Sequence, residues 1–314
     1  MRMTLATALV LLALASPGVA EDMNSKLQDA LSPSLEGLPT DTTVGVVLLD
    51  GRGDVLFSQN AELELSAASS IKSSLLLEFF AKHASELRAT GRRDVRAIVE
   101  DPRHPAIVHF DQATQQEIAG QLGDASVLRL GYILIDSNDE TGAEYSNKVY
   151  NAAANVAIAL LGGPAGSTRA IHERDASFAG ANLRRYMLAD RNVTGDNTAT
   201  PMMLARFFQI ALGEGHAGVD PAVAQAVADV LHRGDEPSGL KHFSKTGALY
   251  TDPVTSVRSG RYERGGRVMN YAIMATQKLG SPTSGAEQYK KLSEMTRGML
   301  EDTKRAWSAA SEAP

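Results

Sequence analysis

Hydrophobic residues follow a strand-like pattern at both ends of the chain. A β-branched apolar run over 43–49, the turn sequence Asp50-Gly51-Arg52-Gly53 and a second short run over 54–58 predict a β-hairpin near the N-terminus. Three more strands are expected in the last third of the chain, over 242–250, 256–262 and 267–276. The segment 286–309 then has the apolar spacing of an amphipathic helix.

Between these groups of strands the apolar spacing becomes helical. The segment 69–87 is apolar nearly all round, which predicts a central, buried helix. Further helices are expected over 23–35, 114–122, 127–135, 151–161, 200–212 and 222–231. Prolines interrupt 92–110, for which no element is predicted, and 177–199 is typical of a long polar loop.

This order of elements predicts an α+β fold. We expect an antiparallel sheet built from N- and C-terminal segments and flanked by helices, with an all-helical lobe inserted between them. The sheet lobe would comprise residues 21–66 and 240–314, and the helical lobe residues 67–239.

The first twenty residues have the features of a secretory signal peptide. Arg2 gives a positive start, 5–15 is apolar, and 16–20 ends in small residues. The apolar run is short for a membrane span. We therefore expect cleavage after Ala20 and a mature chain, starting near Glu21, that is periplasmic or secreted and has no stable membrane anchor.

Composition narrows the chemistry further. The chain has 314 residues, a net charge of −6 and no cysteine, which excludes disulfides, thiolate metal sites and cysteine nucleophiles. It has no clustered basic patch, so no nucleic-acid partner is expected. The seven histidines form no helical His-x-x-x-His pair, and the glycine-rich stretch 162–168 lacks the lysine of a phosphate-binding loop. We expect neither a metal nor a cofactor.

Two short motifs are candidates for catalysis. The run Ser69-Ser70-Ile71-Lys72 places a hydroxyl and an amine three residues apart at a helix start, where they share a face. A lysine with a lowered pKa could take the proton of the serine, and free N–H groups of the helix could stabilise an oxyanion. An N-cap serine beside a snorkelling lysine is the alternative.

The second motif, Lys245-Thr246-Gly247, lies midway along a predicted strand. A glycine there would let a substrate lie against the strand, while Lys245 and Thr246 could bind a carboxylate. The alternative is an exposed edge strand protected by its lysine.

Both motifs, in this order, resemble those of class A β-lactamases and penicillin-binding proteins, whose signatures are Ser-x-x-Lys, Ser-Asp-Asn and Lys-Thr-Gly. The segment 152–164 is similar to the family's helix after Ser-Asp-Asn, and 196–201 is similar to the segment that closes its Ω-shaped loop. The resemblance implies an acyl-enzyme on Ser69, with Lys72 as base. Its substrates would be small-molecule acyl donors, namely β-lactams or related amide and peptidoglycan-type compounds.

The resemblance also implies roles for residues around Ser69. The N–H groups of Ser69 and of a residue near Ala248 would form the oxyanion hole. Substrate-binding roles are implied for Asn151, Lys245, Thr246 and Gly247. Arg258, on the strand after Lys-Thr-Gly, matches an arginine that many members use for the substrate carboxylate.

The chain departs from the family at Ser-Asp-Asn. An alignment on the alanine-rich helix places Val149-Tyr150-Asn151 there, so that Asn151 matches the family's asparagine and valine replaces the serine. A competing alignment uses Ser137-Asn138-Asp139, a scrambled form of the motif. Ser137, Ser146 and the phenol of Tyr150 all remain candidates for the missing acid–base hydroxyl.

A second departure lies in the Ω-like loop. Class A β-lactamases carry a glutamate there that activates water for deacylation. The matching stretch, 182–185, contains no acid, although Glu173 precedes it and Asp190 follows it. An acyl-enzyme would therefore form and persist. A catalytically degenerate protein that binds a ligand or a protein partner in the same cleft is the alternative function.

Overall fold

The computed structural model describes residues 17–280 and 283–309. Its centre is a six-stranded antiparallel sheet with the order β2-β1-β8-β7-β6-β5, in which N-terminal β1 pairs with C-terminal β8. The strands are β1 (Thr42–Asp50), β2 (Val55–Gln59), β5 (His232–Asp235), β6 (Lys241–Leu249), β7 (Val254–Arg264) and β8 (Arg267–Gln277). The predicted α+β fold, with a sheet made from both ends of the chain, is confirmed.

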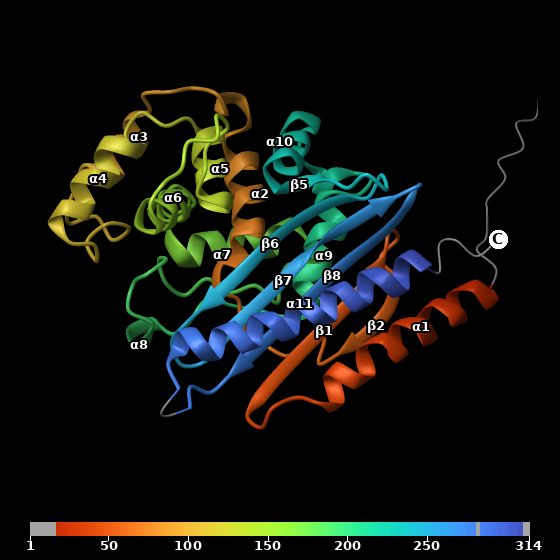
Figure 1. The fold of residues 1–314 in the computed structure, drawn as a ribbon. Coiled ribbons are helices and arrows are strands. Elements are labelled where there is room, and N and C mark those ends of the chain that lie inside the picture. Colours follow the sequence, from red (N-terminus) through yellow and green to blue (C-terminus); the bar gives the residue numbers. More distant parts are fainter. Residues whose placement is uncertain (1–16, 281–282, 310–314) are drawn as a thin grey trace, which may run out of the picture.

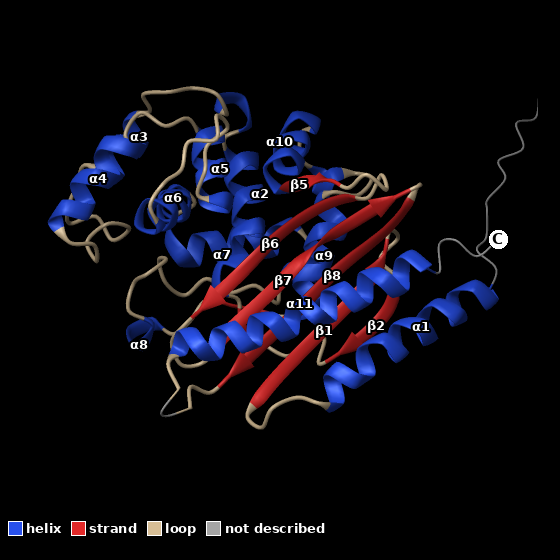
Figure 2. Ribbon diagram, in the orientation of Figure 1, coloured by secondary structure: helices blue, strands red, loops and turns tan. Residues whose placement is uncertain are grey.

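Helices cover both faces of this sheet (Figures 1 and 2). One face carries α1 (Pro17–Glu36) and α11 (Gly285–Ala309), which also pack against each other, and the other face carries α9 (Pro201–Ala211). The remaining helices are α2 (Lys72–Lys82), α3 (Arg93–Val99), α4 (Gln112–Leu122), α5 (Val127–Asp136), α6 (Asn147–Leu160), α7 (Gly163–Arg174), α8 (Arg191–Thr194) and α10 (Pro221–Leu231). Short elements complete the described chain: β3 (Leu65–Ser66), β4 (Thr198–Ala199) and the 3₁₀ turns η1 (Ala68–Ile71), η2 (Ala84–Glu86), η3 (Ala176–Phe178) and η4 (His216–Gly218).

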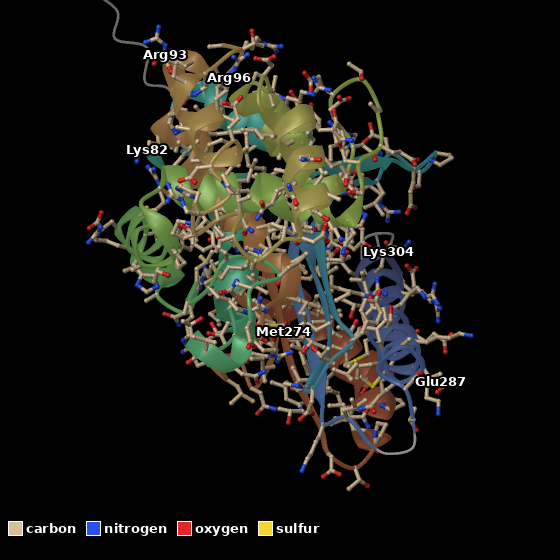
Figure 3. All side chains as sticks on the ribbon, turned by 90° about the vertical axis from the view of Figure 1, so that its left-hand side faces the viewer. Lys82, Arg93, Arg96, Met274, Glu287 and Lys304 are labelled. Atoms are coloured by element: carbon tan, nitrogen blue, oxygen red, sulfur yellow. The ribbon has the colours of Figure 1, made fainter. Side chains whose placement is uncertain are left out.

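The sheet separates two hydrophobic cores, which explains the unbroken apolar run in β1. Val44 and Val46 pack in the core under α1 and α11, whereas Val47 and Leu49 pack in the core shared with the helical part. A strand buried on both faces does not alternate between apolar and polar residues. Figure 3 shows Met274 of β8 inside the molecule and charged residues such as Glu287 projecting from its surface.

Several helix ends differ from the prediction. The N-terminal helix continues through Pro33 to Glu36, and the helix predicted over 69–87 is a 3₁₀ turn followed by α2, which ends at Lys82. Helix α6 begins at Asn147, one turn before the predicted start. Ser146 caps it by accepting a hydrogen bond from the N–H of Val149 (3.3 Å).

Three helices lie where none was predicted. Helix α3 lies within the proline-interrupted stretch, and the short α8 lies within the predicted polar loop. The third, α7, begins at Gly163, immediately after the expected helix stop. Gly162 and Gly163 have positive φ angles that turn the chain, and Pro164 occupies the first turn of the new helix, where its missing N–H costs nothing.

The predicted signal peptide falls largely outside the described residues, since 1–16 are not among them and 17–20 form the start of α1. Within the described part of the chain, no helix is long and apolar enough to cross a membrane.

The crossing of α2 and α5 at Gly131 gives a test of the packing. A Cβ atom on Gly131 would lie 2.2 Å from the ring of Phe80 and 2.9 Å from Leu76, so Gly131→Ala forces this contact apart. We expect the free energy of unfolding in urea to fall by about 1–3 kcal/mol. Gly120→Ala in α4 is the control, because a Cβ there meets nothing within 4 Å and the change should stabilise the helix by about 0.5–1 kcal/mol. Equal effects of the two changes would contradict the close crossing.

Candidate active site

Ser69 lies in the tight turn η1, between β3 and α2. The preceding residue, Ala68, has a left-handed φ of 47°, which is unfavourable for a residue with a Cβ. The neighbouring Ser70 is fully buried, and its hydroxyl donates to the carbonyl of Ala67 (2.6 Å). Ser69 is partly exposed and lines the largest pocket at this end of the sheet, so it is the serine that a ligand can reach.

Lys72 begins α2, and its side chain is completely buried. Its Nζ donates to Oδ1 of Asn151 (3.0 Å) and lies 3.3 Å from the ring centroid of Tyr150. Burial lowers the pKa of this amine to about 8, with a smaller contribution from the positive charge of Lys245, and Tyr150 opposes the shift.

Tyr150 connects Ser69 to both lysines. Because α6 begins at Asn147, Tyr150 and Asn151 lie in its first turns and face the buried amine of Lys72. Tyr150 lines the same pocket as Ser69 and Lys245, and Nζ of Lys245 lies 5.5 Å from the centroid of its ring. Burial alone would raise the pKa of Tyr150, but the positive charges of Lys72 and Lys245 outweigh it and lower that pKa to about 7.

The Lys-Thr-Gly segment forms the other wall of the site. Strand β5 pairs only with 241–243 of β6, so the edge of β6 beyond this pairing is open towards the Ser69 turn. Lys245 is buried and Thr246 is exposed. A Cβ on Gly247 would lie 2.7 Å from the carbonyl oxygen of Ala67. Gly247 therefore lets the strand approach the Ser69 turn, whereas the sequence suggested that it makes room for substrate.

These segments enclose a pocket of about 740 Å³. Ser69, Tyr150 and Asn151 lie on one side of it, with Lys245, Thr246 and Ala248 of β6 beside them. The stretch 185–192 forms a further wall, and Leu249 at the end of β6, with 250–252 after the strand, extends the pocket away from Lys245. The structure thus brings together every predicted site residue except Ser137 and Arg258, with Lys72 buried behind the wall and Gly247 against the Ser69 turn.

Ser137 lies in a smaller neighbouring cavity of about 280 Å³, which shares Asn147, Tyr150 and Lys245 with the Ser69 pocket. It ends α5 with a left-handed φ of 60°, and its hydroxyl donates to the carbonyl of Asp136 (2.5 Å). Ser146 caps α6 and donates to Glu117 (2.9 Å), so of the candidate hydroxyls it is Tyr150 that shares the pocket with Ser69.

Arg258 does not occupy the predicted position. Its guanidinium donates to Oγ1 of Thr296 (3.2 Å) and to the carbonyl of Ser293 (3.1 Å), both on α11. The side chain therefore packs against the helix that covers the opposite face of the sheet, and the expectation that it lines the substrate pocket is wrong.

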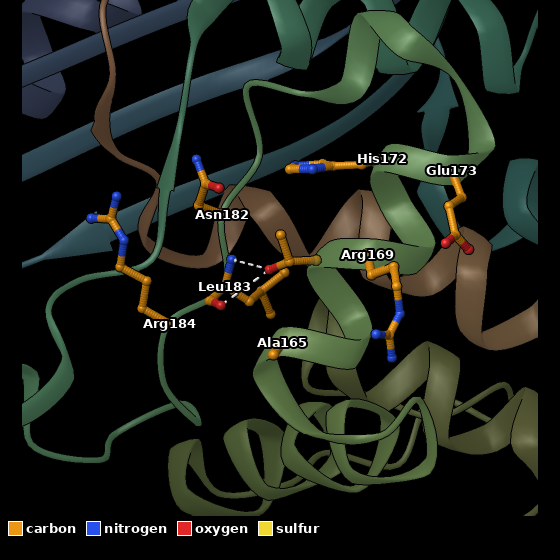
Figure 4. A pocket seen from close by; sticks show the side chains of 8 residues that line it. Ala165, Arg169, His172, Glu173, Asn182, Leu183 and Arg184 are labelled. Carbon is orange, nitrogen blue, oxygen red and sulfur yellow. Dashed lines mark hydrogen bonds between the residues drawn. The ribbon is translucent and has the colours of Figure 1, made fainter.

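The part of the Ω-like loop that faces Ser69 also differs from the sequence alignment. Asn182 exchanges backbone hydrogen bonds with Thr198 (2.9 Å each). Together with Arg184 and Glu173, Asn182 lines a separate pocket of about 500 Å³ against α7 (Figure 4). The loop residues that line the Ser69 pocket are Arg185 and 187–192, which overlap the aligned stretch 182–185 only at Arg185.

Two arginines of the Ω-like loop belong to a cluster of charges that sequence analysis missed. Asp196 accepts hydrogen bonds from Arg185 (2.7 Å), Arg191 (3.0 Å) and the hydroxyl of Ser66 (2.6 Å). The two arginines are the only available signal in the sequence, and nothing in their spacing indicates that they converge on one carboxylate. Among the described residues, no group of three or more histidines and acids is arranged to hold a metal ion.

A Ser-x-x-Lys turn against a Lys-Thr-Gly strand, in a sheet built from both chain ends beside a helical lobe, defines the fold of the class A β-lactamases. The chain is similar to a β-lactamase from Sphaerobacter thermophilus at 22% identity and a TM-score of 0.59, covering 94% of this chain and 98% of that one. It is also similar to a class A β-lactamase from Bacteroides cellulosilyticus at 13% identity and a TM-score of 0.63, covering 90% of this chain and 98% of that one. A β-lactamase from Burkholderia vietnamiensis is similar at 18% identity and a TM-score of 0.62, covering 96% of this chain and 100% of that one. No protein-family model and no curated protein matches the chain.

The charge of Tyr150 can be measured directly. We expect the phenolate absorbance of one tyrosine to increase through pH about 7. This transition should be missing in Tyr150→Phe and retained in Tyr145→Phe, since burial and the hydrogen bond to Asp139 raise the pKa of Tyr145. Lys245→Ala removes a positive charge and should move the transition to higher pH. A wild-type protein in which no tyrosine ionises below pH 9 would contradict the lowered pKa.

Proposed function

We propose that this protein is a serine hydrolase that forms an acyl-enzyme on Ser69 with β-lactams or related amide and peptidoglycan-type acyl donors. The observation that carries this proposal is the position of Tyr150, which lines the same pocket as the reachable Ser69 and whose ring centroid lies 3.3 Å from Nζ of Lys72 and 5.5 Å from Nζ of Lys245, both buried. A serine becomes nucleophilic when a neighbouring base takes its proton, and this site supplies such a base at neutral pH.

The geometry favours Tyr150 as that base. In its phenolate form Tyr150 accepts the Ser69 proton while Oγ of Ser69 attacks the substrate carbonyl carbon. When the C–N bond breaks, the leaving nitrogen takes the proton back from Tyr150. Lys72, which the sequence suggested as the base, donates to Asn151 and stays protonated, so that its charge keeps Tyr150 ionised.

The remaining residues bind and orient the substrate in this proposal. Lys245 and Thr246 hold a substrate carboxylate, and Asn151 holds an amide of the acyl donor. The backbone N–H groups of Ser69 and Ala248 receive the developing oxyanion. The positive charge of Lys245 therefore has two roles in this proposal: it binds the substrate carboxylate, and it lowers the pKa of Tyr150.

The proton-transfer roles predict a pattern of acylation rates. Tyr150→Phe should lower the acylation rate constant by about 10²–10⁴, the range for loss of a general base. In the wild type this constant should rise with pH through about 7, because only the ionised phenol accepts the proton. Lys72→Ala should shift this rise to higher pH. Stopped-flow measurement with a chromogenic β-lactam tests both, with Lys82→Ala, at the exposed end of α2, as control.

A Tyr150→Phe variant that keeps the wild-type rate would contradict the role of Tyr150. Complete loss of acylation in Lys72→Ala at every pH, together with that result, would return the role of base to Lys72.

Deacylation is the slower of the two chemical steps in this proposal. Three carboxylates line the pocket, and each has hydrogen bonds of its own. Asp190 caps α8 by accepting from the N–H of Asn192 (2.9 Å), Asp196 binds the two arginines, and Asp252 accepts from the N–H of Leu279 (2.8 Å). Glu173 lies in the pocket against α7. Since water needs a carboxylate that holds it over the ester, we propose slow hydrolysis.

Mass spectrometry after mixing with a reactive β-lactam tests acylation and its persistence. We expect one stoichiometric adduct that remains for many minutes. Ser69→Ala should abolish it, and Ser70→Ala, a change of the buried neighbour, should retain it. Rapid multiple turnover would overturn slow hydrolysis and leave Ser69 as nucleophile. Neither adduct nor turnover with any β-lactam would favour a protein that only binds ligands in this pocket.

A further inference from the structure

The ring of Tyr150 forms part of the wall between two cavities. It lines the Ser69 pocket of about 740 Å³ and, together with Asn147 and Lys245, the smaller cavity of about 280 Å³ that contains Ser137. Tyr150 is partly exposed. A small molecule that enters the Ser69 pocket therefore meets the side chain of Tyr150 as well as that of Ser69.

The two lysines beside this ring have no carboxylate to balance their charge. Nζ of Lys72 lies 3.3 Å from the ring centroid and donates to the neutral amide of Asn151 (3.0 Å), and Nζ of Lys245 lies 5.5 Å from the same centroid. Both lysines are buried, and within residues 17–280 and 283–309 neither is in an ion pair with a carboxylate. Two cations held away from water favour an anion between them, and the phenol of Tyr150 is the titratable group that lies beside both.

The carboxylates that line the two cavities are engaged with other groups. In the smaller cavity, Asp136 is paired with Nη1 of Arg233 (2.8 Å). The carboxylates of the Ser69 pocket accept hydrogen bonds from arginines or backbone N–H groups, namely Asp190, Asp196 and Asp252. The two lysines therefore outweigh the effect of burial and lower the pKa of Tyr150 to about 7, so that a phenolate is present at neutral pH.

We propose that Tyr150 is a second nucleophile of this pocket and a covalent site for sulfonyl electrophiles, independent of the hydroxyl of Ser69. The phenolate oxygen attacks the sulfur atom of a sulfonyl fluoride, an O–S bond forms, the S–F bond breaks, and fluoride leaves with the bonding electron pair. The product is an aryl sulfonate ester on Tyr150. No proton is transferred in this step, so it needs no further base.

The two nucleophiles suit different electrophiles. A carboxylic ester on Tyr150 would have a phenolate as its leaving group and would be more reactive than the alkyl ester on Ser69, so carbonyl donors end on Ser69. A sulfonate ester of a phenol resists hydrolysis, so the sulfonyl group stays on Tyr150. The pocket therefore accepts two classes of electrophile at two different atoms.

Tyr250 provides a control within the same pocket. It is 54% exposed, and its ring packs against that of Tyr289 with the centroids 4.6 Å apart. Burial raises the pKa of Tyr250, so at pH 7 about one part in a thousand or less is ionised. Exposure alone would make Tyr250 react before Tyr150, whereas the neighbouring cations favour Tyr150.

Reaction of the Ser69→Ala protein with benzenesulfonyl fluoride tests the inference. Mass spectrometry of the intact chain and of its peptides should show one sulfonyl group, located on Tyr150. The rate constant should fall by about tenfold for each pH unit below about 7, because only the phenolate reacts. Adding Tyr150→Phe should abolish the adduct. Adding Tyr250→Phe, the matched control, should leave the rate of modification unchanged.

The outcomes separate this inference from the proposed function. An unmodified Ser69→Ala protein overturns the role of Tyr150 as a nucleophile, whatever β-lactams do to the wild type. A sulfonyl group on Tyr250 or Lys245 at a comparable rate overturns it as well. Peptide mapping locates the adduct in the Ser69→Ala protein itself, so the result stands even if Tyr150→Phe fails to fold. A sulfonyl adduct on Tyr150 in a protein that no β-lactam acylates would support this inference and contradict the proposed function.

Discussion

The buried amine of Lys72 is the constraint on which the site depends. An ammonium group without water is costly unless other groups compensate for the lost hydration. Here the oxygen of Asn151 and the phenol of Tyr150 compensate, and both come from the start of α6. The same contacts lower the pKa of Tyr150 to about 7, so the arrangement that stabilises a buried cation also prepares a base beside Ser69.

The scaffold holds these groups from three directions. Helix α2 is buried along most of its length and fixes Lys72, while α6 contributes Tyr150 and Asn151. Strand β6 can approach the Ser69 turn only because Gly247 has no side chain. The Ω-like loop is attached through Asp196, which binds two arginines and Ser66. Positioning by helices and strands gives a site more precision than loops alone would.

The proposed chemistry differs from the family's signatures in an instructive way. Valine replaces the serine of Ser-Asp-Asn, yet the next residue places a phenol against both lysines and Ser69. In the Ω-like loop, by contrast, nothing of similar kind replaces the glutamate, because the carboxylates in the pocket are engaged in caps and ion pairs. The proposed site therefore has a base for acylation but no free carboxylate for deacylation, and for this reason the proposal predicts a long-lived adduct.

The sequence by itself determined the fold class, all strands of the central sheet except β5, and the placement of Ser69 and Lys72 within one helical turn of each other, since apolar periodicity and short-range spacing depend only on neighbours along the chain. It also narrowed the acid–base hydroxyl to Ser137, Ser146 and Tyr150. Only the tertiary structure decided that Tyr150 shares the pocket with Ser69, that Arg258 faces α11, and that 187–192 line the pocket while 182–184 do not. These features depend on where α6 and α7 begin and on contacts between residues far apart in the chain, and local sequence patterns do not specify either.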